Sequence, residues 1–272
     1  MHEMLRRRCT LVLLAAVVLA LFTGLLAWGP VPWNASSLPP APARRALDLA
    51  ALQNVLCSLA QVLAGAWGWR VTRASPLPPA LQRPWAAFHL LIVAAGGAAL
   101  LFHLSPGWPT WLLAHATVSG AFAMLAAGAL AERVDARIGE APLLAALLLL
   151  VLAAALATAW SGGTDLRGLL LLEVLPALLL PASAFGLRGD WTRAPDWTVM
   201  LSGYYLARLA GAHDAWVRTA LGGLGGQALM HLLLAGVSGW LAYCAWCAGR
   251  AWAAGAADSA SSRSHTALNT AG

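Results

Sequence analysis

Lysine is absent from this chain and acidic residues are scarce, with 11 aspartates and glutamates among 272 residues. Charged side chains make up 10% of the sequence, whereas about 25% is usual for a soluble domain. So few charges cannot cover a water-exposed surface, which excludes a soluble globular protein. Because lysine is absent, the formal net charge of +6 rests on arginine alone.

Cysteine is also scarce, with four in the chain. Cys9 and Cys57 are isolated, and Cys244 and Cys247 form a single C-x-x-C. A zinc or iron–sulfur site built from cysteine needs a second pair of ligands. We therefore interpret the four cysteines as helix-packing residues.

Long apolar runs take the place of the missing charges, since 60% of the residues are hydrophobic. A bilayer core about 30 Å thick is crossed by a helix of roughly 20 apolar residues. The sequence contains eight such runs separated by short breaks with Pro, Gly or Arg. It therefore predicts an all-α integral membrane protein of about eight spans, at 11–28, 47–69, 85–104, 110–130, 142–160, 168–186, 196–212 and 225–248.

These runs divide the chain into four parts. Residues 1–28 form a basic cytoplasmic end and a signal-anchor helix, and residues 29–46 form an external loop. Residues 47–248 form a seven-helix membrane domain, and residues 249–272, rich in Ala, Ser and Gly, form a disordered cytoplasmic tail. A cleaved signal peptide is the alternative for the first run, but no small-residue cleavage site follows it closely.

The arginines predict the orientation. With eight spans and the N-terminus inside, the inner segments carry twelve arginines and the outer loops four, at Arg44, Arg45, Arg167 and Arg218. This positive-inside bias places both termini in the cytoplasm, with the bacterial inner membrane as the location. The arginines form no basic stripe on a soluble module, so membrane lipid and not nucleic acid is the expected partner. Protein partners are not indicated.

Polar side chains inside the spans are costly and often mark functional sites. In the predicted topology they fall in one outer layer, comprising Gln53, Asn54, His103, His115, Glu173, Arg208, Gln227 and His231. This layer predicts a polar cavity that opens toward the outer face, the alternative being that polar residues gather near helix ends. We expect Glu173 and Arg208 to form an ion pair. Gln227 and His231 lie four residues apart, on one helix face.

Five segments in order also carry a family resemblance. They are Asn54 to Leu59 before Val62 to Gly65, Gly96 to His103, Ala131 to Val134 after Phe122, Asp165 to Arg167 with Pro176 and Pro181, and the Gly-rich stretch that ends at His231. Together they resemble the alkaline ceramidase branch of the CREST superfamily, in its bacterial ceramidase-like form. The resemblance implies a seven-helix CREST-like bundle, here preceded by one N-terminal transmembrane helix.

The resemblance further implies a zinc ion whose bound water attacks a lipid amide. Two of the family's five metal-site positions are kept here, as His103 and His231. The other three are substituted by Ala99, Ala114 and Gln227. His115 and Gln227 are further candidates for zinc ligands. We therefore expect lost or altered hydrolase activity, the alternative being an active zinc-dependent amide hydrolase of ceramide-like lipids with a rearranged ligand set.

Two other chemistries are alternatives for these spans. The stretch from Gly236 to Gly239 reads as the Gly-x-Ser-Gly of a rhomboid-type protease, but it lies on the last span and no later span carries a His base. Small residues for close helix packing are the preferred interpretation of this stretch. Haem ligation by His103 and His231 has no further His pair to support it.

Overall fold

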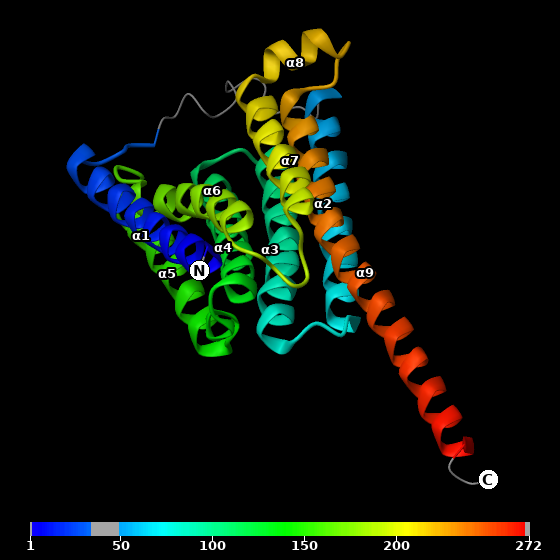
Figure 1. Ribbon diagram of the computed structural model, residues 1–272. Coiled ribbons are helices and arrows are strands. Elements are labelled where there is room, and N and C mark those ends of the chain that lie inside the picture. Colours follow the sequence, from blue (N-terminus) through cyan, green and yellow to red (C-terminus); the bar gives the residue numbers. More distant parts are fainter. Residues whose placement is uncertain (1, 34–48, 270–272) are drawn as a thin grey trace.

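The computed structural model describes residues 2–33 and 49–269, and the regular secondary structure within them is all helical (Figure 1). This confirms the predicted all-α class. The helices are α1 (His2–Trp28), α2 (Leu49–Ala74), α3 (Pro79–Leu104), α4 (Trp108–Arg133), the 3-10 helix η3 (Ala136–Gly139), α5 (Ala141–Trp160), α6 (Arg167–Gly186), α7 (Ala194–Ala212), α8 (Asp214–Ala220) and α9 (Gly226–Asn269).

Seven of the described helices are long and apolar enough to cross a membrane, namely α1 from Arg8, α2, α3, α4, α5, α6, and α9 to Arg250. The protein is therefore a multi-pass membrane protein. The remaining predicted span, at 196–212, corresponds to α7, which is 19 residues long and carries Asp196 and Arg208. Its composition alone does not indicate a span.

The neighbours of α7 show that it nevertheless runs the length of the bundle. Thr192, just before it, contacts Arg133 at the end of α4, whereas Gly211 near its other end contacts Gln227 at the start of α9. Following the predicted orientation, we call the end at the α3–α4 and α8–α9 connections the outer end and the opposite end the inner end. Figure 1 shows α7 beside α9, with α8 at the outer end.

Helices α2 and α3 pack closely because each has a glycine where it meets the backbone of the other. A Cβ atom at Gly65 would lie 2.9 Å from the carbonyl oxygen of His89, and one at Gly96 would lie 3.1 Å from that of Ser58. Small residues allow backbones in a membrane to approach this closely. The contact brings polar side chains of α2 against α3 and α9.

The main core lies around α3 and α4, where Trp85 and Met124 are fully buried. Helix α1 packs at the edge, where Leu14 contacts Leu179 and Leu187 at the inner end of α6. Helix starts follow ordinary rules, since proline occupies the first turn of α3, α4, α5 and α7.

Two of the predicted parts of the chain are only partly described by the structure. The tail expected to be disordered from residue 249 is helical in its backbone to Asn269, and its alanine content explains why, because alanine has the highest helix propensity. Of the external loop at 29–46, the part beyond residue 33 lies outside the described residues, as do Arg44 and Arg45.

The described part of that loop is fixed to the α5–α6 connection. Trp33 N donates to Gly163 O at 2.7 Å, and Leu166 N donates to Val31 O at 2.8 Å. In the same connection, the Arg167 guanidinium donates to both Asp165 oxygens at 2.8–3.0 Å. These bonds hold the pKa of the Asp165 carboxyl below its usual range.

Candidate functional site

A small cavity, with about 40 Å³ open to the centres of water-sized molecules, lies between α3, α4, α6, α7 and α9, with one contribution from α2. Its lining is almost entirely apolar and consists of Gln61, Phe88, Ile92, Val118, Ala121, Phe122, Leu125, Ala177, Leu180, Trp197, Met200, Leu201, Tyr204, Leu234 and Val237. None of the eight residues predicted to line a polar cavity belongs to this set, so the polar cavity stays a prediction. Gln61 and Tyr204 supply most of the polarity.

The first polar group beside the cavity joins three helices. His103 Nε2 of α3 lies 3.2 Å from His231 Nε2 of α9, and His231 Nδ1 lies 2.9 Å from Gln61 Oε1 of α2. With Gln61 Oε1 as the acceptor, His231 Nδ1 carries a proton and donates it. In the neutral ring His231 Nε2 is then an acceptor, so His103 Nε2–H donates to it.

The same geometry suits part of a zinc site. Two imidazole nitrogens on one tetrahedral zinc, each about 2.0–2.1 Å from the metal, lie roughly 3.3–3.4 Å apart. Gln61 would then orient the His231 ring as outer-shell carbonyls do. Two imidazoles do not complete a zinc site, however, and the described residues contain no group of three His, Cys, Asp or Glu side chains that could hold a metal ion.

The other candidate ligands face elsewhere. Gln227 Nε2 donates to Gly211 O at 3.1 Å and its backbone N–H donates to Asp214 Oδ1 at 2.9 Å, so Gln227 ties α9 to the end of α7. His115 Nδ1 lies 2.9 Å from Glu173 Oε1 on α6. The residues present therefore do not fit a tightly held zinc ion.

The His115–Glu173 pair is the second polar group. Ser119 Oγ donates to the same Glu173 oxygen at 3.4 Å, and the Glu173 side chain is 6% exposed. Among the described residues Glu173 pairs with His115 and not with Arg208, so the predicted Glu173–Arg208 ion pair was wrong. Arg208 instead lies on an exposed face of α7.

Gln53 and Asn54 form no part of either group. Their side-chain carbonyl oxygens are buried near the outer start of α2 without a hydrogen-bond partner in the described part of the chain. The predicted outer layer thus divides into separate clusters.

Helix periodicity places both polar groups at the outer end of the cavity. His231 precedes the lining residue Leu234 by three positions, and His115 precedes Val118 by three. Glu173 precedes the lining residue Ala177 by four. Residues three or four apart share a helix face, so each polar side chain lies one turn beyond an apolar lining residue, toward the outer end.

The inner end of the cavity is closed by Trp197, which is fully buried. Its indole Nε1–H donates to Thr192 Oγ1 at 2.8 Å. Thr192 Oγ1 in turn donates to Glu132 Oε2 at 2.6 Å and accepts from Arg133 Nη2 at 2.8 Å. The position of this tryptophan is therefore set by a polar network at the end of α4.

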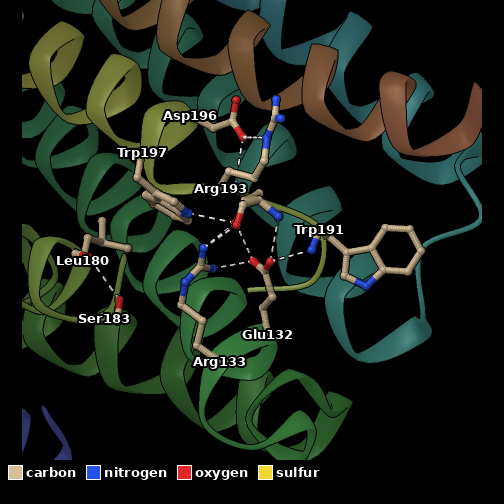
Figure 2. Close-up of polar contacts among 9 residues, drawn as sticks. Glu132, Arg133, Leu180, Ser183, Trp191, Arg193, Asp196 and Trp197 are labelled. Carbon is tan, nitrogen blue, oxygen red and sulfur yellow. Dashed lines mark hydrogen bonds and ion pairs between the residues drawn. The ribbon is translucent and has the colours of Figure 1, made fainter. Parts of the chain in front are cut away.

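Figure 2 shows that Glu132 and Arg133 both reach toward the α6–α7 connection. Glu132 Oε1 accepts from the backbone N–H groups of Trp191 and Thr192 at 2.8 and 2.7 Å. Glu132 Oε2 and Arg133 Nη1 are 2.5 Å apart, and both side chains are 1% exposed. These two residues lie in one of the segments that carry the family resemblance. Nothing in the sequence indicates that they form this network.

A buried Ser–His pair was also missed. His89 Nδ1 lies 3.0 Å from Ser238 Oγ, within the Gly-x-Ser-Gly stretch. A rhomboid-type protease would need a His on a later span, whereas the fold places one from α3 beside Ser238. Both residues are fully buried and neither lines the cavity. The pair is therefore sealed from substrate, which supports the packing interpretation of Ser238.

The sequence matches no protein-family model, and no curated protein matches it.

Proposed function

We propose that this protein is a ceramidase-like membrane protein that has lost amide hydrolysis and retains the apolar cavity as a lipid-binding site. In this proposal both termini are cytoplasmic and the membrane is the bacterial inner membrane. The observation that carries the proposal is the cavity. Its lining is almost entirely apolar, with Gln61 and Tyr204 as polar members, and the two polar groups lie one turn beyond its outer lining residues.

The lining of the cavity supports a lipid chain as the occupant, because it is almost entirely apolar. The cavity volume of about 40 Å³ is well below the roughly 300–1,000 Å³ of small-molecule sites, so a chain enters only as the lining side chains move apart. An acyl chain gains little free energy on moving from the bilayer into an equally apolar cavity. Affinity and selectivity therefore depend on the polar side chains at the outer end, among which the Gln61 amide nitrogen makes no hydrogen bond in the described part of the chain.

Replacing the lining residue Leu234 by tryptophan tests this function, because the larger ring fills the space that a chain would occupy. We expect native mass spectrometry of purified wild type to find one bound lipid per chain, and Leu234→Trp to lose it. Leu232→Trp is the matched control, since Leu232 is 40% exposed on the same helix. Equal lipid retention by both variants, or no lipid in wild type, would contradict the proposal.

A second candidate function is zinc-dependent hydrolysis of ceramide-like amides, which the 3.2 Å separation of His103 Nε2 and His231 Nε2 favours. Because a third ligand is lacking, we expect elemental analysis to find much less than one zinc per chain. The control is His103→Ala with His231→Ala. Near-stoichiometric zinc that this double variant loses would overturn the expectation and favour the hydrolase.

A further inference from the structure

The His115–Glu173 pair has hydrogen-bonding capacity that the fold does not use. Glu173 Oε1 accepts from both His115 Nδ1 and Ser119 Oγ, while Glu173 Oε2 makes no hydrogen bond among the described residues. The Glu173 side chain is 6% exposed, and its Oε2 is not one of the fully buried oxygens that lack a partner, so a ligand can reach it. This oxygen is therefore available to a donor from outside the chain.

The histidine adds a second acceptor. Because its Nδ1–H donates to the carboxylate, the neutral imidazole carries a free lone pair on Nε2. The His115 side chain is 29% exposed, so a ligand can reach this nitrogen. The Trp111 ring lies against the imidazole with centroids 4.0 Å apart, and together with Glu173 it fixes the ring plane.

Position connects this site to the cavity. His115 and Glu173 each lie one helical turn beyond lining residues of α4 and α6, toward the outer end. Tyr204, which does line the cavity, stacks edge-on against Phe122 with centroids 4.7 Å apart. A chain that fills the cavity from the outer end would therefore carry its polar group past the Glu173 carboxylate.

The chemistry of the site selects the polar group. Two acceptors with no donor between them favour a hydroxyl or an amine, both of which bring N–H or O–H donors. An anionic group is disfavoured, because repulsion from Glu173 acts in a poorly hydrated environment. Arg208 is exposed on α7 and makes no ion pair with Glu173 among the described residues.

From these observations we infer that the His115–Glu173 pair is the polar subsite of the cavity and that it binds single-chain amphiphiles carrying a hydroxyl or amine in preference to those carrying a carboxylate. The inference rests on the proposed lipid-binding function, since the cavity must hold the chain. It assigns the selectivity to residues outside the His103–His231 pair.

Three amphiphiles of equal chain length test it, namely a long-chain alcohol, the corresponding amine and the corresponding fatty acid. Each is titrated into the full chain in nanodiscs of zwitterionic lipid, and binding is followed by the shift in unfolding temperature and by native mass spectrometry. We expect wild type to bind the alcohol and the amine at least about tenfold more tightly than the carboxylate, the size of one lost charged hydrogen bond.

Glu173→Gln keeps the shape of the side chain and removes its charge, so it should bring the three affinities within about threefold of one another. Glu140→Gln, at an exposed carboxylate beside the inner start of α5, should keep the selectivity of wild type. Wild-type selectivity is measured without any substitution, so the inference stays testable even if Glu173→Gln does not fold.

The outcomes separate the two proposals. Binding that Leu234→Trp abolishes, but that is equal for all three amphiphiles in wild type, overturns the subsite and leaves the cavity function intact. Selectivity that survives in a folded Glu173→Gln variant also overturns the subsite. No binding of any of the three by wild type contradicts the lipid-binding function itself.

Discussion

Replacing Glu132 by alanine is expected to lower the free energy of unfolding by about 3–5 kcal/mol, the usual cost of removing one partner of a buried ion pair. Glu132 accepts hydrogen bonds from Arg133, from Thr192 Oγ1, and from the backbone N–H groups of Trp191 and Thr192. Alanine leaves all four donors without their acceptor. It also leaves the Arg133 charge, 1% exposed, without its counter-ion.

The effect should extend to the cavity. Thr192 links Glu132 to Trp197, so loss of the carboxylate frees the tryptophan that closes the inner end. The measurement is thermal unfolding of the purified protein in detergent, followed by near-ultraviolet circular dichroism. Asp190→Ala is the control, because Asp190 is an exposed acid of the same connection, and it should change stability by less than about 0.5 kcal/mol. Equal unfolding temperatures for the two variants would contradict the importance of the network.

Gly68→Ala is expected to destabilise the bundle by about 1–3 kcal/mol, the usual cost of overpacking a core. A Cβ at Gly68 would overlap the Cε1 and Nδ1 atoms of the His89 ring. The ring cannot move away freely, because it is fully buried and hydrogen-bonded to Ser238 at 3.0 Å. Alanine therefore separates α2 from α3 or breaks the His89–Ser238 bond.

Two controls distinguish this clash from a general effect of losing glycine. A Cβ at Gly97 of α3 would meet nothing within 4 Å, so Gly97→Ala should be neutral or stabilise by up to about 1 kcal/mol through helix propensity. In a His89→Ala background the clash is removed, and Gly68→Ala should then cost little. An unchanged penalty in that background would show that the imidazole is not the cause.

Hydropathy predicted the helices well because the hydrocarbon core imposes a minimum apolar length. It placed their ends less well. The third span was predicted from residue 85, but α3 begins at Pro79. The turns that hold Gln82 and Arg83 are helical without being apolar, and hydropathy detects only the apolar part of a helix.

The polar side chains were harder to pair. Their order in the sequence gives the depth of each residue along its helix, and Glu173, Arg208 and His115 were all placed near the outer end. Depth does not say which way a side chain faces. Helix packing turns Glu173 toward His115 and leaves Arg208 on an exposed face, a result that depends on the rotation of α4, α6 and α7 about their own axes.

One of the contact residues that the sequence analysis missed could have been predicted from its spacing. Gln61 follows Asn54 by seven positions, so both lie on one face of α2. That spacing could have identified Gln61, whose side-chain amide contacts His231, as a polar residue inside the bundle. The contact between His89 and Ser238 could not be predicted from the sequence, since 149 residues separate them. Thr192 lies in the connection between α6 and α7, and a search for apolar spans does not consider such connections.

The sequence by itself determined the all-α membrane class and the approximate length and order of the helices, because these depend on local composition and on the thickness of the bilayer. Only the tertiary structure decided which polar groups meet, that the cavity lining is almost entirely apolar, and that Glu132 and Arg133 close its inner end through Thr192. The physical reason is that buried donors and acceptors require partners, and a partner on another helix is chosen by packing, which local sequence does not encode.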